Sequence, residues 1–192
     1  MKSPLLGFVA ACLLLLPMTA RAAEAPFVID TSHTQTTFTI DRFGFTTIIG
    51  AFGKSSGTIF LDEAAPDKSR VEAVVEIGTL WAGDATREDH VKGPRWLNAA
   101  ANPTASFKST KVTVTGKDTA TVEGDLTLMG KTLPQTFEVK LNKLAVTPNN
   151  SKKTAGFTIT GVISRKAFGS LGAANLIGDA VSVRIEALAV GS

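Results

Sequence analysis

The chain has 192 residues, with 20 basic and 17 acidic side chains and a formal net charge of +3. This length suits one domain or at most two small ones and excludes a large multidomain assembly. The charges form no long basic run, which argues against a nucleic-acid partner. Hydrophobic residues make up 44% of the chain, and its many Thr, Val, Ile and Phe residues favour strands, so an all-β domain is predicted.

The N-terminus has the three-part layout of a secretory signal peptide. Lys2 precedes an apolar run over residues 5–17, and the triplet Ala20-Arg21-Ala22 follows it. We therefore expect residues 1–22 to be removed and residues 23–192 to form the mature domain in the periplasm. Two alternatives stay open. One is a membrane anchor, although the run is shorter than the roughly 17 to 25 residues that span a bilayer; the other is lipidation at Cys12, which lies deep inside the run.

Cleavage after Ala22 removes Cys12, the single cysteine of the chain. The mature domain then has no disulfide, no thiolate nucleophile and no cysteine-ligated zinc. Its stability has to come from a packed core, which a domain of this size can form.

Period-2 alternation dominates the mature chain and predicts a series of strands. Between residues 120 and 128, for example, Val122, Leu126 and Leu128 alternate with Glu123 and Asp125. This pattern is typical of a strand with one buried and one solvent-exposed face. In chain order, strands are expected at residues 27–41, 45–52, 56–62, 70–80, 104–115, 120–128, 133–141, 155–163 and 181–189. Residues 45–62 form either one bent strand or two, so the count is eight or nine.

One segment interrupts the strands. Thr86-Arg87-Glu88-Asp89 has the layout of a capping box, with a hydroxyl that can accept from the amide three residues on. Gly93-Pro94 ends that turn, and Pro94 suits the first position of another. A short helical excursion is expected around residues 86–99, with Trp81 and Trp96 beside it.

Strands with one apolar face can close into a barrel, pair as a sandwich or form an outer-membrane barrel whose apolar face points outward. The membrane form requires aromatic girdles at two interfaces, whereas this chain has no Tyr and two Trp. A barrel of about eight strands with its apolar face inward is wide enough to hold one small ligand.

Blocks of sequence along the whole mature chain carry a family resemblance. The opening holds Ile29-Asp30-Thr31-Ser32-His33-Thr34 and Arg42-Phe43-Gly44-Phe45-Thr46. The later blocks are Arg87-Glu88-Asp89-His90-Val91, residues 102–109, residues 124–132 and Ile163-Ser164-Arg165-Lys166-Ala167-Phe168-Gly169. In this order they resemble the YceI-like family of exported lipocalin-like proteins, from about Phe27 to Val190.

This resemblance implies an extended eight-stranded antiparallel lipocalin-like barrel closed around a long apolar pocket. It also implies periplasmic binding, storage or transport of an isoprenoid lipid, either a polyisoprenoid or an isoprenoid quinone or its precursor. The expected partner is thus a small apolar lipid, with transient contact to the envelope membrane, no further cofactor and no metal; a dimer stays open. The alternative function is an envelope interaction module, a β-barrel with a filled core and no lipid.

Apolar residues on the inward faces and in the family blocks are the candidates for lipid contact. They are Phe38, Ile40, Phe43, Phe45, Phe52, Phe107, Leu126, Leu128, Phe137, Phe157, Ile159 and Phe168. A polar headgroup would need donors at the mouth of the barrel, and the candidates for that contact are His33, Arg42, His90 and Arg165.

Catalysis is the competing class of function. Asp30, Ser32 and His33 contain the residue types of a hydrolytic triad, but neighbours on a strand point to opposite faces, so we expect Ser32 and His33 to lie apart. His33 and His90 are the only two histidines of the chain, so a metal centre would have few histidine ligands. The protein is therefore predicted not to be an enzyme.

Overall fold

The computed structural model describes residues 24–148 and 151–192, so the predicted signal peptide, residues 1–22, lies outside the described part of the chain. The strands are β1 Ala25–Ile29, β2 Gln35–Arg42, β3 Thr46–Phe52, β4 Ser55–Leu61, β5 Arg70–Glu76, β6 Leu80–Trp81, β7 Thr104–Val114, β8 Thr119–Leu128, β9 Lys131–Val146, β10 Lys153–Ser164 and β11 Ile177–Gly191. One α-helix, α1 Ala85–Lys92, and two 3₁₀ turns, η1 Pro66–Lys68 and η2 Ile77–Thr79, complete the described elements.

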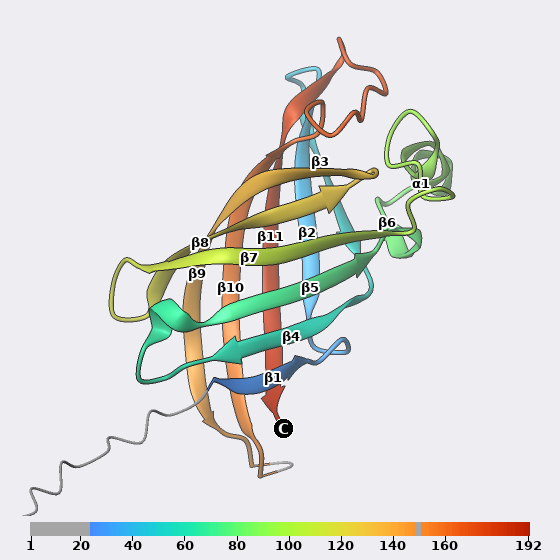
Figure 1. Cartoon of the computed structure of the whole chain (residues 1–192). Helices are drawn as coiled ribbons and strands as arrows, with labels where there is room; N and C mark the ends of the chain where they lie inside the picture. The colour runs from blue at the N-terminus through green and yellow to red at the C-terminus, as the bar shows by residue number, and fades with distance from the viewer. Residues whose placement is uncertain (1–23, 149–150) are drawn as a thin grey trace, which may run out of the picture.

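Eight strands close into one antiparallel barrel. The order is β1-β4-β5-β7-β8-β9-β10-β11, and β11 pairs again with β1. The rest of β11 pairs with β2, which is followed by β3 and β6. Figure 1 shows β4, β5 and β7 running across β10, β11 and β2. The eight-stranded antiparallel barrel predicted from the sequence is therefore confirmed.

Two of the expected strands are broken. The predicted strand over residues 27–41 divides into β1 and β2 at a turn over residues 31–33, and the predicted strand over residues 70–80 is interrupted by η2. The region from 45 to 62 forms two strands, β3 and β4, which is one of the two arrangements expected. Between β3 and β4 the amide of Gly53 donates to the hydroxyl of Thr79 at 3.0 Å, which ties this connection to η2.

The last four strands, β8 to β11, are longer than expected. β9 has 16 residues and β11 has 15. At about 3.3 Å per residue a strand of this length runs roughly 50 Å along the chain. Both strands exceed the nine residues expected for each of them, 133–141 and 181–189.

The helix is shorter than predicted and begins elsewhere. The carboxylate of Asp84 accepts from the amide of Arg87 at 2.8 Å and caps α1, so Thr86 is not the capping residue. Glu88 instead accepts from the amide of Ala82 at 2.8 Å. The helix ends at Lys92 because Gly93 takes an extended conformation, as a residue before proline tends to do. None of the helices in the described ranges is long and apolar enough to cross a membrane.

We refer to the two ends of the barrel by their contents. The helix end holds the turn over residues 43–45, α1 and the segment 165–176; the terminus end holds the start of β1, the loop 62–69 and the turn 115–118. Near the terminus end a core cluster packs between β1, β10 and β11; its buried members are Phe27, Ala155, Phe157, Ala187 and Ala189. This end of the barrel is thus held together by ordinary apolar packing.

Candidate functional site

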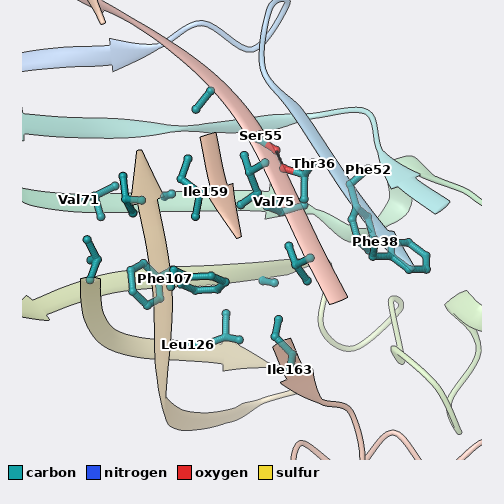
Figure 2. Close-up of a pocket in the computed structure, with 18 of the residues that line it drawn as sticks. Thr36, Phe38, Phe52, Ser55, Val71, Val75, Phe107, Leu126, Ile159 and Ile163 are labelled. Carbon is teal, nitrogen blue, oxygen red and sulfur yellow. Dashed lines mark hydrogen bonds between the residues drawn. The ribbon is translucent and has the colours of Figure 1, made fainter. Parts of the chain in front are cut away.

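A cavity of about 790 Å³ runs through the barrel. At the helix end its lining includes Arg42, Phe43 and His90, and at the terminus end it includes Arg70 and Lys117. Between the ends the walls come from most of the barrel strands, and Figure 2 shows their side chains converging on one interior space. The arrangement is a long tube with an apolar middle and charged residues near both ends.

Strand parity places the apolar side chains inside. Phe38 and Ile40 line the cavity, whereas Thr37 and Thr39 border a shallow groove outside it. Ten of the twelve residues proposed for lipid contact belong to the lining: Phe38, Ile40, Phe43, Phe52, Phe107, Leu126, Leu128, Phe137, Phe157 and Ile159. Nine of them lie on strands, where the period of two predicts their direction; Phe43 lies in the turn between β2 and β3.

Two of the proposed contact residues lie elsewhere. Phe45 is 90% exposed at the end of the turn between β2 and β3. Phe168 is buried, but it lies in the turn that follows β10 and is not part of the lining. Both predictions were wrong for the same reason, because the period of two orients side chains only within a strand and a turn resets that orientation.

Three glycines give the cavity its width. A Cβ on Gly50 would lie 2.2 Å from the Phe38 ring, and one on Gly161 would lie 2.5 Å from the Phe137 ring. A Cβ on Gly124 would similarly lie 2.5 Å from the ring of Phe107. Each ring therefore takes up the space that a Cβ would need at the glycine beside it. Phe107 and Phe137 also meet edge to face at 5.1 Å between centroids, a favourable aromatic geometry, and the lumen between the walls stays open.

Two of the proposed headgroup donors line the cavity at the helix end, and one lies outside it. Arg42 and His90 belong to the lining at the helix end, whereas His33 lies in the turn over residues 31–33, outside the lining. The guanidinium of Arg42 stacks on the ring of Phe43 at 4.7 Å from the centroid. Arg42 and His90 are thus placed to meet a polar group at this end, and His33 is not.

Arg165 lines the same end but its donors are already used. It is only 4% exposed, and its guanidinium donates to the carbonyl oxygens of Ser170, Gly172, Ile177 and Gly178 at 2.7 to 2.9 Å. The expectation that Arg165 offers donors to a headgroup was therefore wrong. Burial lowers the pKa of Arg165 below its ordinary value, and its structural task is to hold the segment 165–178 in place.

Neighbouring groups support this segment. Asp179 accepts from the amide of Lys166 and from the hydroxyl of Ser164, both at 2.8 Å. These bonds lower the pKa of Asp179, the amide of Lys166 having the largest effect. The guanidinium of Arg165 also lies 5.0 Å from the centroid of the Trp96 ring, and Trp96 lines the cavity. Trp81, by contrast, is 57% exposed and lies outside the lining.

Asp30, Ser32 and His33 do come together, contrary to the expectation from strand geometry. They lie in a turn, not in a strand, and Ser32 Oγ is 3.0 Å from His33 Nδ1. However, Asp30 Oδ2 approaches the same Nδ1 at 2.8 Å, and Ser32 Oγ donates to Asp30 Oδ1 at 2.6 Å. A hydrolytic triad needs the serine and the carboxylate on different ring nitrogens. This cluster instead lowers the pKa of Asp30 to about 2, chiefly through the Ser32 hydrogen bond and then that of His33.

Further lining residues were missed by the sequence prediction. Val71, Ala73 and Val75 alternate along β5 and line the cavity, as do the hydroxyl residues Thr36 and Ser55. The β5 set follows the same period of two and could have been found by it. Thr36 shares its parity with Phe38 and Ile40, so the same period of two also places it inside.

The fold and the cavity together define a class of proteins: antiparallel β-barrels that enclose an elongated apolar space. A family model described as the YceI-like domain matches residues 27–189, and this chain belongs to the YceI-like family. It is 35% identical over 168 residues to Protein YceI of Salmonella arizonae, covering 88% of this chain and 87% of that protein.

Solved structures share the barrel. BcnA of Burkholderia cenocepacia superimposes with a TM-score of 0.74 at 22% identity, covering 83% of this chain and 98% of that one. A polyisoprenoid binding domain from Saccharophagus degradans gives a TM-score of 0.66 at 14% identity, covering 88% of this chain and 99% of its own. At these identities the similarity concerns the fold.

Proposed function

We propose that this protein binds a long apolar isoprenoid lipid non-covalently inside the barrel and stores or transports it in the periplasm. The observation that carries the proposal is the apolar cavity of about 790 Å³, which runs between the two ends of the barrel. Its volume falls in the range of roughly 300 to 1,000 Å³ that is usual for small-molecule sites. A shared fold with a domain described as polyisoprenoid binding supports the same ligand class, either a polyisoprenoid or an isoprenoid quinone.

The apolar walls of the cavity suit the hydrocarbon chain of an isoprenoid lipid. Burial of hydrocarbon stabilises a complex by about 0.8 kcal/mol per CH₂ and requires no directional bond. Side chains such as Phe38, Phe107 and Ile159 provide that environment along the tube. The same cavity disfavours the alternative function, an interaction module with a filled core, because a filled barrel has no space of this size.

Delivery of the lipid involves transient contact with the envelope membrane in this proposal. Phe45 is 90% exposed, and Leu176, also at the helix end, is 56% exposed. Phe43 both lines the cavity and is 38% exposed, so this apolar surface is continuous with the tube. Exposed apolar residues of this kind mark interaction sites, and a bilayer is the source from which an isoprenoid would enter.

Melting temperatures of delipidated variants test the proposal. Phe38→Ala should melt lower than wild type, because the half-buried Phe38 ring packs against Phe52; the loss should stay below the roughly 3 to 5 kcal/mol of a fully buried Phe. Excess isoprenoid quinone should restore part of the loss because it binds only the folded state. Thr39→Ala is the control on the outer face and should respond to lipid as wild type does. If lipid raises the melting temperature of none of the three proteins, the proposed function is wrong.

A further inference from the structure

One polar pair interrupts the apolar middle of the tube. The side chains of Thr36 and Ser55 line the cavity and are only 5% and 6% exposed. Their hydroxyl oxygens lie 2.8 Å apart and share a hydrogen bond. Figure 2 shows both oxygens side by side among the apolar side chains of the wall.

The pair has more donor capacity than it uses. Each hydroxyl carries one proton and two lone pairs, and only one of the two protons lies between the oxygens. Within the described part of the chain, neither hydroxyl has a second hydrogen-bond partner; the carbonyl of Ser55 separately accepts from Thr31. One buried O–H is therefore left to donate, and burial of a donor without an acceptor is costly.

The pair lies midway along the tube. At about 3.3 Å per residue, Thr36 is roughly 20 Å from Arg42 at the end of β2, and Ser55 is roughly 20 Å from Leu61 at the end of β4. These two strands run to opposite ends of the barrel, since β2 ends at the helix end and β4 at the terminus end. A ligand atom beside the hydroxyls is thus deep inside the barrel, far from either mouth.

We propose that Thr36 and Ser55 recognise an uncharged oxygen of the lipid, a carbonyl or hydroxyl, held at the middle of the tube. This inference rests on the proposed lipid binding and adds the chemical class of the ligand. A carbonyl accepts the free proton, and a hydroxyl can also donate to a lone pair of the couple.

Charge decides between neutral and phosphorylated lipids. The cationic lining residues lie towards the ends, with Arg42 and Arg87 at one and Arg70 and Lys117 at the other. Two hydroxyls alone cannot compensate a phosphate that is taken out of water, because burial of an unpaired charge is far more costly than burial of a neutral polar group. A neutral prenyl alcohol or quinone suits the middle of the tube, and a prenyl phosphate does not.

Binding preference, rather than affinity alone, tests this assignment. The delipidated protein is titrated with squalene, an isoprenoid hydrocarbon without oxygen, with a linear prenyl alcohol of matching chain length, and with the monophosphate of that alcohol. Wild type should bind the alcohol about three- to tenfold more tightly than squalene, which is the worth of one neutral hydrogen bond. The double variant Thr36→Val with Ser55→Ala should bind the two equally.

Two further variants separate recognition from folding. Thr36→Ser keeps the hydroxyl and should keep the preference for the alcohol; Thr39→Val makes the same threonine-to-valine change on the outer face and should also leave the preference at its wild-type value. The assignment is overturned if wild type binds squalene and the alcohol equally, if the double variant retains the preference, or if the monophosphate binds most tightly. Failure of all three probes to bind wild type would instead overturn lipid binding itself.

Discussion

Replacement of Gly50 by alanine should narrow the cavity by moving a single aromatic ring. The new Cβ would lie 2.2, 2.6 and 2.9 Å from three atoms of the Phe38 ring, and no other group lies among its nearest contacts. Carbon atoms in contact are about 3.5 to 4.0 Å apart, so the ring has to move by at least about 1.3 Å. Phe52, whose ring centroid is 5.6 Å away, limits sideways movement, and the ring is displaced into the lumen.

The consequence for binding follows from the space that the ring takes. If it displaces the equivalent of one or two methylene groups of the lipid, at about 0.8 kcal/mol each, affinity falls about four- to fifteenfold. The lipid-free protein should lose about 1 to 3 kcal/mol of stability, as is typical of an overpacked interior. Lipid affinity is measured by fluorescence titration of the delipidated protein, and stability by urea unfolding.

Gly156→Ala is the matched control, because a Cβ at Gly156 meets nothing within 4 Å. It makes the same change in β10 and should leave lipid affinity unchanged. Equal affinity of Gly50→Ala and wild type for the lipid would refute the reasoning, since the Phe38 ring would then not border the ligand.

Three other variants probe the helix end and the turn after β1. Arg165→Lys should lower the free energy of unfolding, measured by urea titration, by at least about 2 kcal/mol. Lysine cannot reach all four carbonyl oxygens that the guanidinium holds, and each hydrogen bond to a charged group is worth about 1.5 to 3 kcal/mol. An unchanged urea midpoint would contradict the role given to Arg165. Asp30 has a folded-state pKa of about 2 against a usual 3.8, so its ionised form contributes stability that is present above about pH 4 and lost as the pH falls through about 2. Asp30→Asn should therefore differ most from wild type near neutral pH and least near pH 2, and a pH-independent difference in unfolding free energy would argue against this. Phe45→Ser should unfold as wild type does, because Phe45 is 90% exposed, yet co-sediment with lipid vesicles about tenfold less well, the lower bound for losing a buried Phe from the bilayer; undiminished co-sedimentation would place membrane contact elsewhere.

The strands and their buried faces are predicted well from the sequence, because alternation of apolar and polar residues follows directly from the pleat of a strand. Val122 and Leu126 face inward and Glu123 faces away whatever closes the sheet, so the strand and its buried face can be read without knowing its partners. The same parity, together with the family blocks, located ten lining residues. Closure itself could not be obtained from alternation, which is equally compatible with a sandwich, and came from the family resemblance.

The predictions were wrong at turns and at the helix cap, because local side-chain hydrogen bonds decide the structure there. Asp30 bonds Ser32 and His33 and breaks the first strand, a competition between side chain and backbone that a count of apolar positions does not register. Asp84 similarly displaced Thr86 as the helix cap. Arg165 looked like an exposed loop cation, because only the folded chain brings together the four carbonyl groups that surround its guanidinium.

Thr36 is a different kind of omission. Its parity with Phe38 places it inside, but the candidates for lipid contact were chosen among apolar residues, and Thr36 was not one of them. Its partner Ser55 comes from another strand, and only the packing of β2 near β4 brings the two hydroxyls together. Alternation within a single strand cannot predict a hydrogen bond between side chains of two strands that do not pair with each other.

Lipid extraction from the protein as the cell makes it tests the central claim most directly. The protein is purified without detergent from the cells that make it, it is extracted with organic solvent, and the extract is analysed by mass spectrometry alongside the lipids of the same cells. Our account predicts one class of long isoprenoid lipid carrying an uncharged oxygen, strongly enriched over its share of the membrane and close to one molecule per protein. An extract without lipid, or one with the same phospholipid mixture as the membrane, would contradict it.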